Sequence, residues 1–143
     1  MLSNKIEKRE SVISGIGLFA KEDITKGELV WWPTSDTIDK IHVDRLNELS
    51  EEKRKHWIKN AYQMGVYLYL DTDDATYMNH SCDPNVINSD DESLLIARRD
   101  IVKDEEITWN YLPYMNQYLV FQCSCSSKNC IGVVKKGTMT KMI

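Results

Sequence analysis

The sequence contains little proline or glycine, with three and six residues respectively among 143. No Ser/Gly-rich or Pro-rich linker and no low-complexity tract interrupts it, so it predicts one domain with a distinctive C-terminal tail. No apolar run approaches the ~18 residues that a membrane-spanning helix needs. The first ten residues, MLSNKIEKRE, also lack the apolar stretch of a secretory signal. These features predict a soluble, intracellular protein that does not associate with membranes.

A basic excess is also missing, because 18 Lys and Arg residues stand against 22 Asp and Glu, which gives a net charge of −4. Proteins that bind nucleic acid more often carry a basic excess or a basic face, so we expect no direct nucleic-acid binding. A mildly acidic protein suits a basic partner, such as a lysine-rich peptide or protein tail. The hydrophobic share of 42% is sufficient for one core.

Short β-type segments dominate the chain. Strands are predicted at 5–13, 18–20, 29–32, 66–70 and 107–111, with a hairpin that joins 85–88 to 94–97. Ser50 has the features of an N-cap for a helix up to residue 62, in which apolar residues recur at helical spacing. A short amphipathic helix is predicted over 114–121. The predicted fold class is mainly β (a β-rich α+β fold), with little room for parallel βαβ crossovers.

Two similar hexapeptides, DITKGE and DIVKDE, begin at Asp23 and Asp100, and each is followed by a tryptophan at the same offset, Trp32 and Trp109. The similarity has two explanations. It is either favourable strand-turn-strand chemistry used twice or a pair of matching corners in the architecture. At this length it is not a solenoid repeat.

The four cysteines are Cys82, Cys123, Cys125 and Cys130. Three of them lie in the segment CSCSSKNC, where crowded thiolates can surround a tetrahedral Zn²⁺ ion, and Cys82 can supply the fourth sulfur. Disulfides and free thiols are the alternatives, although disulfides are rare in intracellular proteins. A Cys₄ zinc site has no open coordination position, so the favoured interpretation is a structural zinc that docks the tail beside the turn that holds Cys82.

Four segments resemble, in order, the motifs of SET-domain protein-lysine methyltransferases. GIGLFA at 15–20 resembles the family's N-terminal glycine segment, and NHSCDPN at 79–85 resembles its NHSCxPN signature. EEITWNY at 105–111 resembles its E-E-L-T-F-D-Y strand, and the three tail cysteines resemble its post-SET zinc loop. The resemblance extends from about residue 10 to residue 133.

This resemblance implies a SET fold of several small sheets with a pseudoknot near the C-terminus. It implies a SET domain at 1–112 with a helical insert at about 38–65, followed by a post-SET zinc loop and tail at 113–143. The implied activity is transfer of a methyl group from S-adenosyl-L-methionine to lysine in a protein or peptide, such as a histone-like or other basic tail. Zn²⁺ would be the structural metal.

The resemblance also implies roles for individual residues. Those expected to bind the cofactor are Gly15, Ile16, Gly17, Leu18, Asn79 and His80. Tyr111 is the expected catalytic residue, and Trp109 and Tyr111 are expected to line the lysine channel. The expected zinc ligands are Cys82, Cys123, Cys125 and Cys130.

The chain departs from the family pattern at the lysine channel. Trp109 replaces a Phe or Tyr that governs how many methyl groups fit. The usual Tyr after the first K-G-E is missing, because that region reads WWPT from Trp31. Tyr62 and Tyr67 are candidates to replace it.

Two competing interpretations remain from the sequence. The glycine segment fits the G-x-G-x-x-[GA] pattern of dinucleotide-binding proteins, with Asp36 at a suitable distance, but that pattern needs a long helix after the glycines. Lys26-Gly27 interrupts the chain too early for such a helix. The other alternative is a zinc-stabilised SET-like binding module without methyl-transfer activity.

Overall fold

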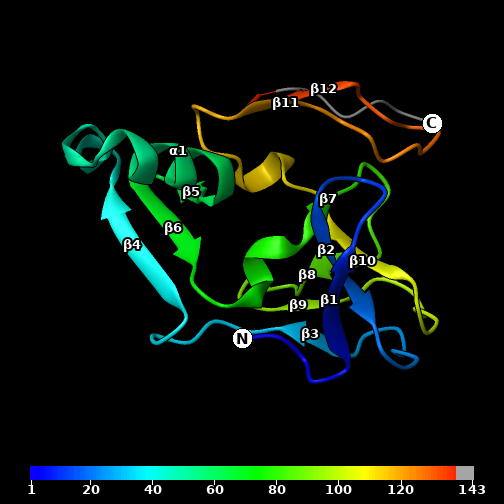
Figure 1. Ribbon diagram of the computed structural model, residues 1–143. Helices are drawn as coiled ribbons and strands as arrows, with labels where there is room; N and C mark the ends of the chain where they lie inside the picture. Colours follow the sequence, from blue (N-terminus) through cyan, green and yellow to red (C-terminus); the bar gives the residue numbers. More distant parts are fainter. Residues whose placement is uncertain (138–143) are drawn as a thin grey trace.

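The computed structural model describes residues 1–137, and within this range the chain forms four small sheets and one α-helix (Figure 1). The strand orders are β1-β2-β10-β7, β3-β9-β8, β4-β6-β5 and β11-β12. The mainly β fold class is confirmed, whereas the end of the predicted tail, 138–143, lies outside the described residues. None of the helices described is long and apolar enough to cross a membrane.

The first two sheets consist of short strands. They are β1 (Ile6–Glu10), β2 (Ile16–Ala20), β3 (Leu29–Trp31), β7 (Asn79–His80), β8 (Val86–Asn88), β9 (Leu95–Ala97) and β10 (Glu106–Trp109). Their apolar side chains share one buried core, which includes Leu18, Ile24, Val30, Val86, Ile101 and Ile107. Because β2 is a strand and not a glycine loop followed by a helix, the dinucleotide-binding interpretation is wrong.

The two similar hexapeptides form matching corners that bind each other. The backbone N–H of Lys26 donates to Asp100 Oδ1 at 2.8 Å, and the backbone N–H of Lys103 donates to Asp23 Oδ1 at the same distance. Each aspartate therefore stabilises the turn of the other hexapeptide. The architectural explanation of the repeat is confirmed, and the paired corners fix the start of β10 against the core.

Strand β10 lies beside segments that are distant in the sequence. It pairs antiparallel with β2 and parallel with β7. The buried Asn85 strengthens this arrangement, since its Nδ2 donates to the Glu106 carbonyl at 2.7 Å and its Oδ1 accepts from the Thr108 N–H at 2.9 Å. The turn after β7 is thus bound against β10 where the two segments cross, and Tyr111 follows directly beyond this crossing.

The third sheet and helix α1 (Glu51–Asn60) form a second layer, seen at the left of Figure 1. The strands are β4 (Ile38–His42), β5 (Tyr62–Met64) and β6 (Tyr67–Asp71). As predicted, Ser50 caps α1, because its Oγ accepts from the Lys53 N–H at 3.2 Å. Side chains alternate along β6, so Leu68 and Leu70 join Trp57 in a buried cluster.

The predicted helix over 114–121 is wrong. A 3-10 helix covers only Leu112–Tyr114, and the chain then extends into the hairpin of β11 (Val120–Gln122) and β12 (Val133–Lys135). Asn116 explains the difference, because its Oδ1 accepts from two backbone N–H groups just after it, those of Tyr118 and Leu119. Its Nδ2 donates to the Ala61 carbonyl at 2.7 Å, which attaches the tail to the end of α1.

Candidate active site

Two cavities share Tyr111 as part of their walls. The first, here called the aromatic cavity, has a volume of about 530 Å³, and its rings come from Trp31, Tyr62, Tyr69, Trp109, Tyr111 and Tyr114. The second, here called the glycine-loop cavity, has a volume of about 590 Å³ and is lined by residues that include Ser14, Gly15, Ile16, Asn79 and His80. Both are lined by Lys59, Asn60, Thr76, Tyr111 and Leu119. The two cavities are therefore adjacent at Tyr111.

The glycine-loop cavity collects four of the six residues expected to bind a cofactor, namely Gly15, Ile16, Asn79 and His80. The other two, Gly17 and Leu18, are buried in β2 and do not line it. Tail residues complete the wall from Leu119 to Ser124. Their apolar members follow no motif that sequence analysis could have used.

The two glycines of this loop are needed for different reasons. Gly15 has φ +47°, in the left-handed region, and no heavy atom lies within 4 Å of the position of an added Cβ. Gly17 is instead in close packing, because an added Cβ would collide with the Glu106 carboxylate and lie 3.0 Å from Ser11 Cβ. Gly15 thus leaves open space beside the cavity, whereas Gly17 allows β2 to approach β10.

The Asn79 side chain holds the glycine loop in place. Its Nδ2 lies 2.9 Å from Glu106 Oε2, 3.1 Å from Ser11 Oγ and 3.0 Å from the Ser14 carbonyl. Ser11 Oγ in turn donates to Glu106 Oε1 at 2.7 Å. The asparagine therefore fixes the wall of the cavity through protein contacts.

His80 connects the cysteines to Tyr111 through its imidazole. Burial lowers the pKa of His80 to about 4, so the ring is neutral at physiological pH. Its Nδ1 accepts from the Tyr111 N–H at 3.0 Å, which places the ring proton on Nε2, 3.4 Å from Cys82 Sγ. The sequence predicted a contact of His80 with the cofactor but did not predict this bridge.

Tyr111 is held by its ring, its backbone and its hydroxyl. The ring packs against His80, Phe121 and Trp109 at centroid distances of 5.3, 5.9 and 6.0 Å. The hydroxyl donates to the Met78 carbonyl. Burial, together with the negative charge of Glu106, raises the pKa of Tyr111 above its usual value. The phenol therefore stays protonated, and its oxygen can accept a hydrogen bond from a bound group.

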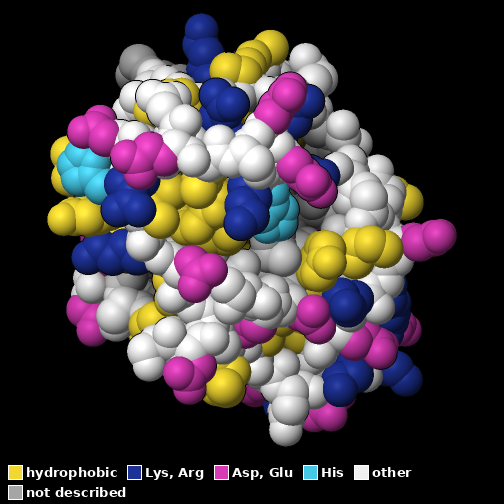
Figure 2. Space-filling view, turned by 60° about the vertical axis from the view of Figure 1, so that its left-hand side comes forward, with side chains coloured by type: hydrophobic (Ala, Val, Ile, Leu, Met, Phe, Trp, Pro, Cys, Tyr) yellow, Lys and Arg dark blue, Asp and Glu magenta, His cyan; other side chains and the backbone are white. Residues whose placement is uncertain are grey.

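The aromatic cavity opens on the side of α1 and the third sheet. Figure 2 shows apolar side chains gathered in the middle of this face, with charged side chains around them. Trp109 is fixed in the wall, because it stacks on Tyr114 at 5.5 Å and its Nε1–H donates to Asn88 Oδ1 at 3.0 Å. Tyr62 and Tyr67 were the candidates to replace the family tyrosine that is missing after the first K-G-E. Tyr62 lines the cavity and Tyr67 does not.

Asp71 and Tyr69 in the aromatic cavity were missed in the sequence analysis. They lie on β6, and alternation places them on the opposite face from the buried Leu68 and Leu70. The pattern from Tyr67 to Asp71 could have indicated this face. Nothing in the sequence indicated that a cavity lies over it.

We expect Asp71→Asn to make the protein more stable at pH 8 but not at pH 4. Burial, followed by the charge of Asp73, raises the pKa of Asp71 to about 7. Between pH 4 and pH 7 the unfolded chain loses this proton first, so the native state becomes less stable as pH rises. The asparagine removes this loss, which is of the order of 2–4 kcal/mol. Denaturant unfolding at pH 4 and pH 8 measures the change in the free energy of unfolding. The exposed Asp39→Asn is the control, and an equal effect in this variant would show that the stabilisation is not specific to Asp71.

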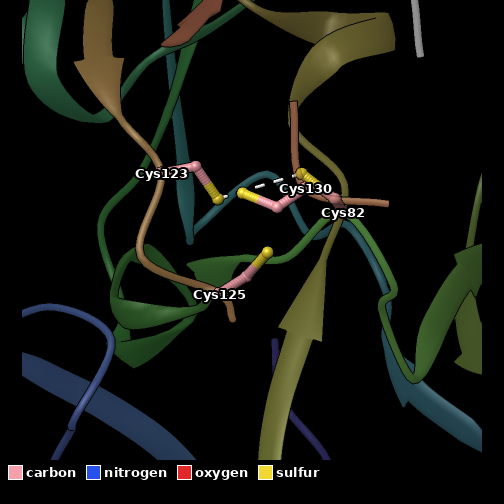
Figure 3. Close-up of side chains that lie close together, drawn as sticks. All are labelled: Cys82, Cys123, Cys125 and Cys130. Carbon is pink, nitrogen blue, oxygen red and sulfur yellow. Dashed lines mark hydrogen bonds between the residues drawn. The ribbon is translucent and has the colours of Figure 1, made fainter. Parts of the chain in front are cut away.

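The four cysteine sulfurs converge between the NHSC turn and the tail (Figure 3). All four Sγ atoms lie within 4.8 Å of one another, and those of Cys82 and Cys123 are 3.8 Å apart. Zn–S bonds of about 2.3 Å place tetrahedral sulfurs about 3.8 Å apart, so this donor set fits Zn²⁺. The cysteines form no disulfides. Asn129 supports the cluster, because its Nδ2 donates to the Cys82 carbonyl at 2.8 Å.

The chain has a β-rich fold, four cysteine sulfurs clustered between its centre and its tail, and two cavities that share Tyr111 in their walls. The family model described as "SET domain" matches residues 15–112. The chain therefore belongs to the SET-domain family, as its motifs predicted.

Individual relatives agree with this assignment. The chain is 32% identical, over 92% of its length, to the "Variant-silencing SET domain-containing protein" of Plasmodium falciparum, and 29% identical, over 95%, to "Histone-lysine N-methyltransferase mes-4" of Caenorhabditis elegans. It spans only 6% and 17% of those two proteins. The methyltransferase domain of human SETMAR has the same fold, with a TM-score of 0.66 and 18% identity over 94% of this chain and 59% of that one.

Proposed function

We propose that this protein is an S-adenosylmethionine-dependent protein-lysine N-methyltransferase. The observation that carries the proposal is the shared wall of the two cavities at Tyr111. One cavity includes the polar glycine loop and the other is lined by aromatic rings, so a cofactor in the first and a lysine side chain in the second would meet at Tyr111. The family membership and the names of the relatives support the same activity.

The glycine-loop cavity is the proposed cofactor site. Gly15, Ile16, Asn79 and His80 would hold the cofactor, since they line the cavity and the space at Gly15 is open. When bound, S-adenosylmethionine supplies a methyl group on a positively charged sulfur. The four cysteines would hold Zn²⁺, which has a structural role because four thiolates complete its coordination.

The aromatic cavity is the proposed lysine channel. A lysine amine has an ordinary pKa near 10.4, so forming the neutral amine at pH 7 costs about 5 kcal/mol. Apolar walls such as Trp109 reduce this cost by disfavouring the charged form. Because the Tyr111 hydroxyl donates to the Met78 carbonyl, its oxygen can accept an N–H from the amine and orient the nitrogen lone pair.

The proposed substrate is a lysine-containing protein with a basic segment, such as a histone-like tail. Relatives named as histone-lysine methyltransferases support this class, and so does the net charge of −4. We propose a SET domain at 1–112, with the insert at about 38–65, and a post-SET zinc loop and tail at 113–143. An intracellular location is part of the same proposal.

Mass spectrometry tests the function. The protein is incubated with isotope-labelled S-adenosylmethionine and a panel of basic proteins, and we expect labelled methyl groups on lysine side chains. Cofactor binding, measured separately by calorimetry, distinguishes the alternatives. Binding without transfer to any member of the panel would favour the non-catalytic binding module. No binding of the cofactor would contradict the proposal outright.

A further inference from the structure

Three buried polar atoms have no hydrogen-bond partner among the described residues, and all three residues line the aromatic cavity. They are Trp31 Nε1, Asp71 Oδ1 and Thr76 Oγ1. Buried polar groups are normally paired, and leaving one unpaired costs about 1–3 kcal/mol. Their concentration in one cavity indicates that a ligand completes their contacts. Of the three residues, Asp71 restricts the chemistry of that ligand most strongly, because its side chain is a carboxylate.

Asp71 lies at the end of β6, on the face that carries Tyr69. Tyr69 stacks on Tyr62 with ring centroids 5.5 Å apart and an interplanar angle of 15°. The charge of Asp71 acts on this stack, because burial and then the Asp71 charge raise the pKa of Tyr62. A carboxylate and a flat pair of rings are therefore neighbours in one partly buried corner of the cavity.

A basic side chain of the third sheet, Lys40, lines the same cavity, but its charge lies over tyrosine rings. Lys40 pairs with Tyr69 across β4 and β6, but its Nζ lies over the Tyr67 ring at 4.2 Å and 5.7 Å from the Tyr69 ring. No ion pair to Asp71 occurs within residues 1–137. Burial, followed by the negative charge of Asp73, raises the pKa of Asp71 to about 7, and the positive charge of the N-terminal amine, which pairs with Asp73, only partly offsets this rise.

We propose that Asp71 and the Tyr62–Tyr69 stack form a subsite for a second basic side chain of the substrate, with arginine preferred over lysine. The proposal rests on the proposed function, because the occupant belongs to the same peptide as the target lysine. A guanidinium is planar, donates two parallel N–H bonds to a carboxylate and stacks on aromatic faces. Its positive charge would also form an ion pair with the buried carboxylate of Asp71. The target lysine is unsuited to this position, because a carboxylate would keep its amine protonated.

Peptide binding tests the subsite without requiring turnover. Short fluorescent peptides carry one lysine and one arginine in an otherwise uncharged sequence, with the spacing varied in both directions. Matched peptides replace the arginine by citrulline, which has a similar shape and no charge, or by lysine. Anisotropy at pH 8, in the presence of S-adenosylhomocysteine, gives the Kd values. At the best spacing we expect arginine to bind at least about 10-fold more tightly than citrulline, with lysine between them.

The Asp71→Asn variant should bind the arginine and citrulline peptides equally. Glu92 is the other carboxylate that lines the cavity, so Glu92→Gln is the control and should still prefer arginine to citrulline. Equal binding of arginine and citrulline by the unaltered protein at every spacing would overturn the proposal. Loss of the preference in Glu92→Gln but not in Asp71→Asn would overturn it as well. Methyl transfer to these peptides is measured in parallel. Transfer without arginine preference contradicts the subsite alone, whereas arginine-dependent binding without any transfer contradicts the proposed activity.

Discussion

Tyr111→Phe is expected to reduce methyl transfer by at least about 100-fold while changing the affinity for S-adenosylmethionine less than about threefold. The substitution keeps the ring, so the packing against His80 and Phe121 is preserved. It removes the hydroxyl that donates to the Met78 carbonyl and, in the proposed mechanism, accepts an N–H from the lysine amine. Orientation of the amine is therefore lost without loss of the cofactor site.

Single-turnover transfer to a basic protein, with calorimetry for cofactor binding, separates these two effects. Tyr118→Phe is the matched control, because Tyr118 is 41% exposed and lines neither cavity. Its transfer rate should be unchanged. Parallel losses of transfer and cofactor affinity in Tyr111→Phe would mean that the hydroxyl supports only the structure, and an unchanged transfer rate would remove Tyr111 from the mechanism.

Removal of zinc is expected to abolish cofactor affinity and to lower the melting temperature by more than about 10 °C. Structural zinc sites contribute binding free energies of about 10–16 kcal/mol in small domains. Here the metal would attach a tail whose residues Phe121, Gln122, Cys123 and Ser124 line the glycine-loop cavity. Without it, the β11–β12 pairing, a small apolar cluster and the hydrogen bond from Asn129 to the Cys82 carbonyl remain to hold that wall.

Metal analysis of protein purified without chelator should give about one zinc per chain, as four thiolates require. Chelation should expose residues 120–135 to limited proteolysis, and added zinc should restore protection and cofactor binding. Cys130→Ser should reproduce the chelated state. Full cofactor affinity in metal-free protein would show that the tail docks without the ion, and a metal content near zero would contradict the site itself.

Local chemistry made much of the fold predictable from the sequence. The Ser50 cap, the helical spacing after it and the hairpin that joins 85–88 to 94–97 depend on residues close in sequence, and these elements occur where predicted. The cysteine cluster was predictable because one segment holds three thiolates and only Cys82 remains. The family resemblance implied a pseudoknot near the C-terminus, and β10 lies parallel to β7 in this region, an arrangement that no local pattern reveals.

What the sequence did not reveal depends on contacts between distant segments. The extended tail after Tyr114 is stabilised by Asn116, whose amide reaches carbonyls at Ile58 and Ala61. The bridge from His80 to the Tyr111 backbone requires the crossing of β10 to exist first. Likewise, the unpaired state of Asp71 is visible only when every neighbour is placed.

The order of strands in the first sheet has a consequence for synthesis. Leu18 of β2 lies opposite Ile107 of β10, and the start of β10 depends on hydrogen bonds between the corners at 23–28 and 100–105. Pairings so far apart in sequence form slowly, because closing the long loop between them is costly in entropy. On the ribosome, the aromatic cavity cannot form until translation has passed Leu119, and the glycine-loop cavity cannot form until it has passed Ser124. Fragments truncated before Leu119 should remain unfolded, and both cavities should form in one late step.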